Sequence, residues 1–315
     1  MSMQAIYEAM QVQTLKGHTL NEVVGGGDPM IVGRECFNYI TSTAALSVDS
    51  RVFEIGSGCG RTSTIIADYL SGSPNRKGRY VGIDIIPGLV DFCVKSIEPE
   101  YPLAKFYLSE DKNPQYDRLV KKRESVYQEL KSSQRVADID GDTFVTGESS
   151  ERFDLVLAFS VFTHLAEAET KLMLDRIARL LTDDGQAILS FFLLDRFSID
   201  CIQNKTAAYF TPAHVAMNIA VDESGGPNGA VGYNQEYLNK MILSAGFTVS
   251  GVEHGRWRNG AGRVFQDMVR IAKKTSLPRD FDAARYLTLN EDVRRSGVRG
   301  AHHFLAYGRR EGRKY

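Results

Sequence analysis

The chain alternates between short apolar runs and longer stretches in which apolar residues recur every three to four positions. Short apolar runs are typical of strands buried on both faces, and the longer spacing is typical of helices. Runs that predict strands lie at 51–55, 79–85, 105–109, 153–159 and 186–194. The helical spacing occurs at 30–47, 62–70, 88–98 and 167–181. This order predicts an α/β fold with an open, mostly parallel sheet and helices on both faces.

Two stretches interrupt this rhythm. Residues 112–151 are charged and then acidic, and they predict a helix followed by a loop inserted into the core. Residues 195–233 have no clean period, and such a long irregular stretch is usually a lid or a binding segment. After it, the sequence predicts one more helix, closed by Gly246, and two final strands. The domains that we expect are 1–276 and a helical extension of two short helices at 278–315.

Length and composition narrow the class of protein. With 315 residues, the chain is near the upper limit for one hydrophobic core. Its 38 Lys and Arg nearly cancel its 39 Asp and Glu, which argues against non-specific binding of nucleic acid. No long apolar stretch predicts a membrane span, and the N-terminus lacks the pattern of a secretory signal. The four scattered cysteines favour reduced thiols and a cytoplasmic location.

The segment VFEIGSGCGRTS joins the first predicted strand to its helix and carries the candidate chemistry. Gly56, Gly58 and Gly60 allow a tight turn and a close approach of the backbone to a ligand. The helix N-terminus that follows favours an anionic group. The dinucleotide fingerprint G-x-G-x-x-G fails here, because Arg61 occupies its third glycine position.

A second pattern, E-x-G-x-G-x-G, is complete when Glu54 is included. With it, the chain resembles the class I S-adenosylmethionine-dependent methyltransferases. Asp84 ends the second predicted strand, and the pair Glu110 and Asp111 follows the third. The segments FDLVLAFSVFTHL and LLTDDGQAILSFF match those around the family's strands four and five. Over about residues 20–275, this resemblance implies a seven-stranded Rossmann-like sheet, with S-adenosylmethionine as cofactor and S-adenosylhomocysteine as product.

The resemblance also implies a role for individual residues. Asp84 would bind both ribose hydroxyls, Glu54 the cofactor's amino group, and Ile85 the adenine. Of Glu110 and Asp111, at least one would contact the adenine edge, although one is also suited to capping a turn. The implied cofactor-binding residues are Glu54, Gly56, Ser57, Gly58, Gly60, Asp84, Ile85, Glu110, Asp111, Phe159 and Ser160.

Two histidines are candidates for a general base, because the pKa of histidine lies near neutrality. His164 follows the turn after strand four, and His214 lies in the irregular stretch. Each is equally suited to packing or capping. His254 and Trp257 follow a late strand and are candidates for the lining of an acceptor pocket.

The acidic loop in the insert has the spacing of a calcium site at Asp138, Asp140 and Asp142. However, Thr143 and Ser149 stand where a calcium loop needs Gly and Glu, so we expect no metal site. The chain also lacks the Asn/Asp-Pro-Pro-aromatic motif of nucleic-acid amino-methyltransferases and the Pro-Cys pair of cytosine-C5 enzymes. Both absences favour a hydroxyl or another group on a small molecule or glycan as acceptor.

The segment FDAARYLTLNEDVRRSGVRGAHHFLAYGRREGR is similar to a short repeat appended to bacterial surface-polysaccharide enzymes, with Glu291 in place of the repeat's proline. We therefore expect O-methylation of a sugar, glycan or other small hydroxyl-bearing acceptor in surface-polysaccharide metabolism. The C-terminal hairpin is a candidate for binding a polysaccharide-assembly partner, and it is equally suited to packing on the enzyme. The alternative is a non-catalytic cofactor-binding subunit or scaffold, and Arg61 disfavours a third hypothesis, an NAD-dependent oxidoreductase.

Overall fold

The chain folds into two compact units, residues 1–272 and 273–315. The computed structural model describes residues 1–44, 46–74, 77–111, 124–133, 135–137, 144–146, 149–214, 218–223, 229–273, 281–308 and 311–315.

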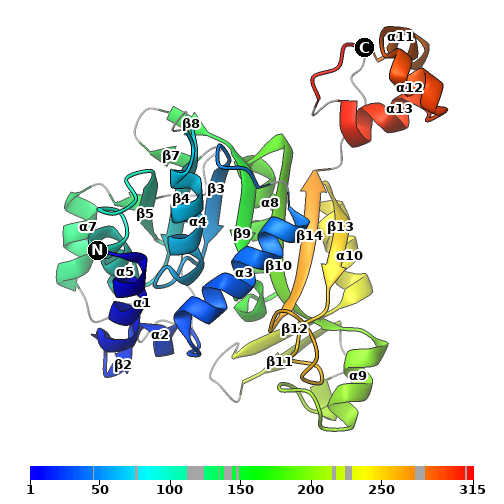
Figure 1. The fold of residues 1–315 in the computed structure, drawn as a ribbon. Coiled ribbons are helices and arrows are strands. Elements are labelled where there is room, and N and C mark those ends of the chain that lie inside the picture. Colours follow the sequence, from blue (N-terminus) through cyan, green and yellow to red (C-terminus); the bar gives the residue numbers. More distant parts are fainter. Residues whose placement is uncertain are drawn as a thin grey trace. The chain divides into compact units, whose positions relative to one another are not determined.

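A mixed sheet organises the first unit (Figure 1). Its central strands are parallel and follow the order β5–β4–β3–β9–β10, and β14 continues the sheet as an antiparallel neighbour of β10, with β13 beside it. These seven strands are the predicted ones, so the α/β fold with a mostly parallel sheet is confirmed. Their bounds are Arg51–Ile55 (β3), Arg79–Asp84 (β4), Ala104–Ser109 (β5), Phe153–Ala158 (β9), Leu181–Leu194 (β10), Phe247–Glu253 (β13) and Asp267–Lys273 (β14).

Strand β10 begins earlier than the sequence predicts, and its carboxyl end is the predicted one. It includes the TDDG segment that the sequence assigns to a preceding turn, and its register with β9 shifts between Leu181 and Gln186. At its other end, β10 continues past β9, and its residues 192–194 pair with residues 232–234 of β12. The sheet therefore extends beyond the end of β9.

The stretch 195–233 is more regular than predicted. It contains α9 (Arg196–Gln203), a 3₁₀ turn η3 (Pro212–His214) and two strands, β11 (Ile219–Asp222) and β12 (Ala230–Asn234). β12 pairs parallel with β10, and β11 pairs antiparallel with β12. The sequence hides β12 because Gly232 weakens the strand pattern. A glycine is required there, since a Cβ would lie 2.9 Å from the ring of Phe210.

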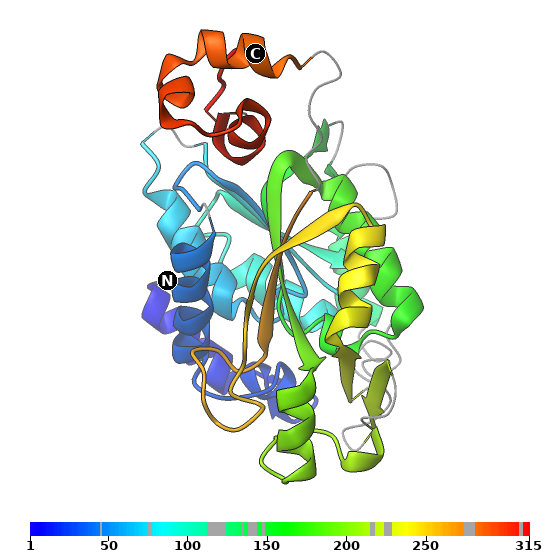
Figure 2. The ribbon, with the colours of Figure 1, turned by 90° about the vertical axis from the view of Figure 1, so that its right-hand side faces the viewer.

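Helices cover both faces of the sheet, as Figure 2 shows. Successive strand residues point to opposite faces, so Val52 lies in one core and Phe53 in the other. Helices α1, α3, α4 and α5 pack on the Val52 face, and α8 and α10 pack on the Phe53 face. Their bounds are Met3–Val12 (α1), Pro29–Thr43 (α3), Arg61–Ser71 (α4), Pro87–Ser96 (α5), Glu167–Leu180 (α8) and Gln235–Ser244 (α10).

Between α1 and α3, a short hairpin and a single helical turn lead the chain across the Val52 face. These elements are β1 (Thr14–Leu15), β2 (His18–Thr19) and α2 (Leu20–Val23). Thr19 and Glu22 form a capping box that starts α2. The Tyr7 hydroxyl donates to the Arg61 carbonyl at 2.7 Å, which fixes α1 to the first turn of α4.

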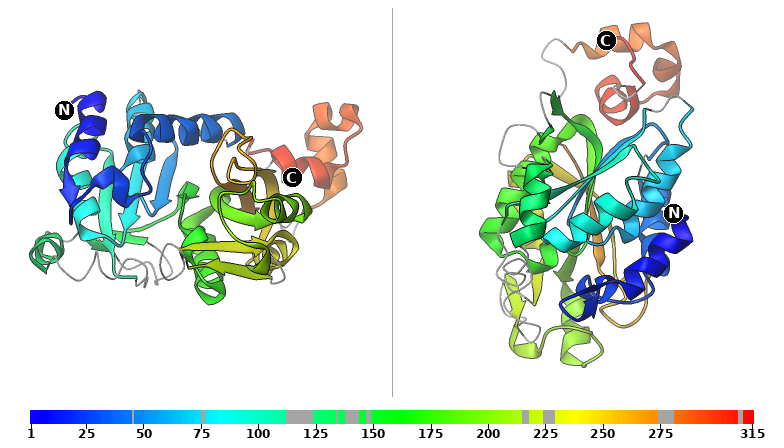
Figure 3. Two further views of the ribbon diagram at one scale, coloured as in Figure 1. Left: turned by 90° about the horizontal axis from the view of Figure 1, so that it is seen from below. Right: turned by 90° about the vertical axis from the view of Figure 1, so that its left-hand side faces the viewer.

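The charged insert carries more structure than the predicted helix and loop. Helix α7 (Glu124–Ser132) lies beside α5 at the β5 edge of the sheet (Figure 3), and β6 (Val136–Ala137) pairs parallel with β5. A hairpin of β7 (Phe144–Thr146) and β8 (Ser149–Glu151) follows, where the sequence predicts loop. The three aspartates of the acidic loop lie outside the described residues.

The described residues of the second unit form three helices, whereas the sequence predicts two. They are α11 (Ala283–Leu289), α12 (Glu291–Ser296) and α13 (Gly300–His303), with a π-helical turn, η4 (Phe304–Gly308), after α13. Gly297, at φ 72°, ends α12 and separates it from α13. Tyr286, Val293 and Phe304 form the small core.

The crossing of α3 over α4 depends on Gly33, because a Cβ there would lie 2.3 Å from the Arg61 carbonyl oxygen. Gly33→Ala should push the helices apart and cost about 2 kcal/mol of unfolding free energy. Ile31→Ala, at an exposed position of α3, is the matched control, and its effect should stay within about 0.5 kcal/mol. Urea unfolding followed by circular dichroism measures both, and equal stabilities would contradict the close crossing.

Candidate functional site

The glycine loop, residues 56–60, connects the carboxyl end of β3 to α4. All three of its glycines have positive φ, and none of them has room for a Cβ. A Cβ on Gly56 would lie 2.6 Å from Val161 Cγ2, and one on Gly60 would lie 2.3 Å from Ile97 Cδ1. The backbone N–H groups of residues 56 and 57 donate to the Ile83 carbonyl, which holds the loop against the end of β4.

Asp84, at the end of β4, is buried and binds the glycine loop directly. Its carboxylate accepts from the Gly58 N–H at 2.8 Å and from the Ile86 N–H at 2.9 Å. Burial raises the pKa of Asp84 to about 6, although these backbone bonds act in the opposite direction. The side chain predicted for the ribose thus lies at the carboxyl edge of the sheet, where α/β folds bind ligands.

Glu54 lies inside the same end of the sheet. Its Oε2 accepts from the Ser63 hydroxyl at 2.8 Å and from the Tyr80 hydroxyl. Burial raises the pKa of Glu54 to about 7, against the effect of these two bonds. In the role predicted for Glu54, the other carboxylate oxygen, Oε1, would therefore accept from the cofactor's amino group.

A strap formed by residues 24–27 crosses the glycine loop, and sequence reasoning missed it. The Arg61 guanidinium donates to the Val24 carbonyl at 2.8 Å and to the Gly26 carbonyl at 2.9 Å. The Val24 side chain lies over Gly58, where a Cβ would be 2.9 Å from it. The residue that breaks the dinucleotide fingerprint thus holds the strap in place.

The turn after β9 lies against the glycine loop through the contact of Val161 with Gly56. Ser160 has φ 56°, an unusual conformation for a residue other than glycine. Its N–H donates to Ser190 Oγ at 2.7 Å, and its hydroxyl donates to Gln266 Oε1 at 3.1 Å. Phe159 and Ile85, also predicted at the site, are half-buried at the edge of the Val52-face core.

A family model described as a methyltransferase domain matches residues 53–187. This span contains the glycine loop, Asp84 and the turn after β9. This part of the chain is a methyltransferase domain, and S-adenosylmethionine is its methyl donor. The residues present fit the cofactor. Ser57 Oγ, in the glycine loop, is buried and has no hydrogen-bond partner in the described part of the chain. Such an atom is expected where a bound ligand supplies the partner.

Solved methyltransferase structures are similar to this one at low sequence identity. A TehB-like S-adenosylmethionine-dependent methyltransferase from Corynebacterium glutamicum is 15% identical, with 80% of this chain and 92% of that chain covered and a TM-score of 0.41. The CcbJ methyltransferase from Streptomyces caelestis is 14% identical (86% and 96% covered, TM-score 0.48). The magnesium protoporphyrin IX methyltransferase from Synechocystis is 13% identical (80% and 91% covered, TM-score 0.46). These likenesses carry no acceptor over to this methyltransferase.

The two residues predicted to contact adenine, Glu110 and Asp111, have different surroundings in the methyltransferase. Asp111 forms an ion pair with the buried Arg176 of α8 at 3.0 Å and accepts from the Ser109 hydroxyl at 2.8 Å. Those bonds favour the turn-forming alternative for Asp111. Glu110 is exposed beside it, and its contact with adenine stays a prediction.

The predicted histidines lie in different parts of the structure. His164 is half-buried in the 3₁₀ turn η2 (Phe162–His164), which directly follows the Ser160 turn. The backbone of His214 lies in η3, and its side chain is outside the described residues. His254 is half exposed, with Nδ1 3.5 Å from the Asp267 carboxylate. The structure thus keeps His164 near the glycine loop and does not test its role.

A buried carboxylate that the sequence did not single out holds the opposite side of the site. Asp267 accepts from the Leu193 N–H at 2.8 Å, the Trp257 indole N–H at 2.7 Å and the Arg258 guanidinium at 3.0 Å. Trp257 is fully buried by these contacts, which favours a supporting role in loop 254–266. Its predicted place in an acceptor pocket stays a prediction.

Arg258 extends this network to α9. Its guanidinium donates to the Asp195 carboxylate at 2.8 Å. Burial alone would raise the pKa of Asp195, but the Ser198 N–H and Arg258 hold that pKa below its usual range. Loop 254–266 is therefore fixed to the end of β10 and to the first turn of α9.

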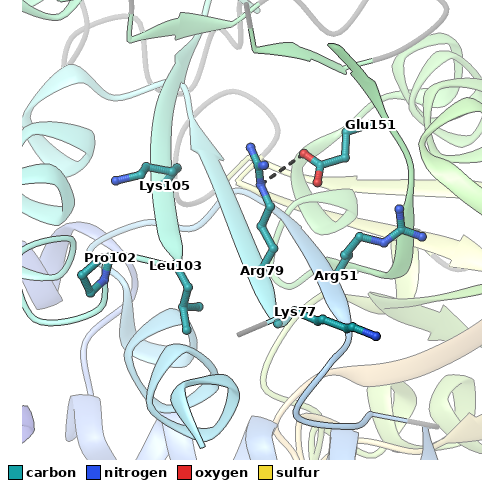
Figure 4. A pocket seen from close by; sticks show the side chains of 8 residues that line it. Arg51, Lys77, Arg79, Pro102, Leu103, Lys105 and Glu151 are labelled. Carbon is teal, nitrogen blue, oxygen red and sulfur yellow. Dashed lines mark ion pairs between the residues drawn. The ribbon is translucent and has the colours of Figure 1, made fainter. Parts of the chain in front are cut away.

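A cavity of about 450 Å³ lies at the other edge of the sheet, at the amino ends of β3, β4 and β5 (Figure 4). Of the cations that line it, Arg79 pairs with Glu151 and Arg51 pairs with Asp154, both at 3.1 Å. Because parallel α/β sheets bind ligands at their carboxyl ends, we place the methyl-transfer site at the glycine loop and not in this cavity.

Two further searches concern the described residues only. No group of three or more His, Cys, Asp or Glu among them is placed to hold a metal ion. Within the same residues, no helix has both the length and the apolar character to cross a bilayer.

Asp84→Asn should weaken binding of S-adenosylhomocysteine at least tenfold, because the ribose diol loses the charged acceptor that takes both of its hydroxyls. The exposed Asp200 of α9 provides the matched control, Asp200→Asn, with an affinity within about twofold of the wild type. Titration calorimetry measures both, and an unchanged affinity in Asp84→Asn would remove Asp84 from the ribose role.

The same variant tests the charge state of Asp84. Since the pKa of this buried carboxyl is about 6, lowering the pH through 6 protonates it and should weaken binding in the wild type. The affinity should level off above about pH 7, once the carboxyl is ionised. In Asp84→Asn the part of this fall near pH 6 should be absent, leaving only the change near pH 7 expected from Glu54. A pH profile identical to that of the wild type would assign the lower titration to another group.

Glu54→Gln should stabilise the protein at high pH. The pKa of Glu54 rises from 4.5 to about 7 on folding, so its stabilising effect is full below 4.5 and is lost as the pH rises through 7. Glutamine is neutral throughout and can still accept from Ser63 and Tyr80. Thermal unfolding without cofactor should show the variant more stable at pH 8 by up to about 3 kcal/mol, with little difference at pH 5. Equal stabilities at pH 8 would mean that Glu54 is ionised without cost.

Proposed function

We propose that this methyltransferase acts on a hydroxyl group of a sugar, glycan or other small acceptor in surface-polysaccharide metabolism. The observation that carries the proposal is a group of three neutral polar residues, Ser160 after β9, Ser190 in β10 and Gln266 before β14, which are bonded to one another. Val161, which follows Ser160, contacts Gly56 of the glycine loop. Hydroxyl and amide groups pair with acceptor hydroxyls without a change in charge. The likeness of residues 281–313 to a repeat of polysaccharide enzymes supports the same acceptor class.

On the cofactor side, we propose that Asp84 holds the ribose hydroxyls and that the glycine loop, with Ser57, holds the methionine part. Glu54 Oε1 accepts from the amino group, Ile85 lies against the adenine, and Glu110 contacts its edge. The bound cofactor supplies a methyl group already activated on a sulfonium. The chain's own work is therefore to orient the acceptor oxygen in line with that methyl group and to exclude water.

For a hydroxyl acceptor, we propose His164 as the general base. It follows the Ser160 turn in the chain and is half-buried, so it is close to the carboxyl end of β9. As the acceptor oxygen attacks, His164 takes its proton, which a side chain with a pKa near neutrality does readily. His214 is the second candidate. His254, half exposed beside Asp267, is proposed for the lining of the acceptor side.

We also propose a cytoplasmic location, because all four cysteines are free. The C-terminal unit is proposed as a docking element for a polysaccharide-assembly protein. The class of this partner comes only from the resemblance of the C-terminal segment to the repeat of polysaccharide enzymes. Nucleic acid is not proposed as a substrate, because the positive and negative charges of the chain nearly balance.

The test is incubation with S-adenosylmethionine and a panel of sugar nucleotides and oligosaccharide fragments, followed by mass spectrometry. We expect a mass gain of one methylene unit on a hydroxyl oxygen. His164→Gln should lower turnover by about 100-fold or more while leaving the affinity for S-adenosylhomocysteine unchanged. His18→Gln, at an exposed position in β2, is the control. Methylation of an amine or of nucleic acid would refute the proposed acceptor, and full turnover in His164→Gln would refute the base.

A further inference from the structure

Three side chains at the carboxyl ends of β9 and β10 and the start of β14 form a closed ring of hydrogen bonds. The Ser160 N–H donates to Ser190 Oγ at 2.7 Å, and Ser190 Oγ donates to Gln266 Oε1 at 2.6 Å. The Ser160 hydroxyl donates to the same Gln266 oxygen at 3.1 Å. Two hydroxyls thus hold the carboxamide by its oxygen, and this fixes the plane of the amide.

The other end of this carboxamide is available to a ligand. Because Oε1 takes both serine hydroxyls, the NH₂ group points away from them. No described group accepts from Gln266 Nε2, and the Gln266 side chain is half-buried while Ser160 is exposed. An amide with a fixed oxygen and a free NH₂ is a directed donor.

The ring lies on the side of the sheet that carries the cofactor residues. Side chains two positions apart on a strand share a face. Ile188 and Met268 lie in the Val52-face core. Ser190, two positions from Ile188 in β10, and Gln266, two positions from Met268 and directly before β14, therefore face the same side. Val161, which follows Ser160, lies against Gly56, so the carboxamide is bonded to the turn that contacts the glycine loop.

The competing explanation is that the ring only connects β14 to the sheet. The bonds of the neighbouring Asp267 argue against this explanation. Asp267 already fixes the start of β14 to β10 through the Leu193 N–H. The left-handed conformation of Ser160 also costs free energy, which proteins tend to tolerate at functional sites. Neither feature is needed merely to join β14 to the sheet.

We propose that Gln266 is an acceptor-positioning residue of the methyl-transfer site, with its carboxamide facing the transferred methyl group and its NH₂ donating to the acceptor oxygen. The position of the carboxamide follows from the ring and the glycine loop. The acceptor oxygen rests on the proposed function. A neutral donor here favours a hydroxyl acceptor and disfavours a protonated amine.

A charged side chain at position 266 tests whether the carboxamide faces the transferred methyl group, and this test needs no acceptor. The probes are S-adenosylhomocysteine, which is neutral at sulfur, S-adenosylmethionine, which is a sulfonium, and sinefungin, which carries an ammonium near the position of the methyl group. Gln266→Glu should tighten sinefungin about tenfold and S-adenosylmethionine about fivefold, with S-adenosylhomocysteine unchanged. Gln266→Leu has no charge and should not favour the two cations.

Gln203→Glu, at an exposed position of α9, controls for a general effect of the added charge. Calorimetry on all three variants gives the affinities, and unchanged S-adenosylhomocysteine binding shows that the fold is intact. If Gln266→Glu alters all three ligands equally, or none of them, the carboxamide does not face the methyl group and the proposal is overturned.

The acceptor contact is tested with the sugar nucleotide or oligosaccharide that the wild type methylates. Gln266→Leu should raise its KM about tenfold with little change in kcat, which a merely structural role would not produce. An unchanged KM would overturn the contact. If the panel yields no methylated sugar while the charge response persists, the acceptor class fails and the position of Gln266 stands.

Discussion

The carboxylate of Asp84 is the constraint on which the cofactor side depends. One buried side chain accepts from the Gly58 N–H and the Ile86 N–H, so the loops after β3 and β4 are fixed to each other. The first of these loops leads directly into α4. Arg61, the first residue of α4, binds the strap that crosses this loop. Removing the Asp84 charge therefore affects the glycine loop itself, in addition to the proposed ribose contact.

Asp267 holds the other side of the site in a different way. It is more deeply buried than Asp84, but the Arg258 guanidinium lies beside it, and Arg258 is itself held by Asp195. Buried charges are tolerated when they are paired and hydrogen-bonded, so this network is a fixed frame for loop 254–266. The acceptor side thus has a rigid frame of paired charges, with a neutral surface at Gln266 on the next residue.

The elements that the sequence predicts correctly are those whose signal is local. Apolar runs such as 153–159 need only burial on both faces to be recognised as strands, and the glycine loop needs only its spacing. β12 was missed because it contains Gly232, which weakens the strand pattern. The ring of Phe210, distant in sequence, leaves no room for a side chain at this position. Gln266 and Asp267 were missed for a similar reason, since the contacts of Gln266 with Ser160 and of Asp267 with Leu193 join residues 106 and 74 positions apart, and no local pattern marks them. The left-handed turn at Ser160 is also invisible in the sequence, because serine rarely adopts it.

The charges around the glycine loop explain why its sequence departs from the dinucleotide pattern. Burial raises the pKa of both Glu54 and Asp84, so the fold alone disfavours their ionised forms. A pyrophosphate beside two carboxylates would be repelled, whereas a ligand with an ammonium and a sulfonium favours the ionised forms that the fold alone disfavours. Arg61 does not offset this, because its guanidinium is bonded to the carbonyls of the strap. The third glycine of the dinucleotide pattern would remove this anchor and leave the carboxylates in place, so the loop is matched to a cationic methyl donor by its charges as well as by its shape.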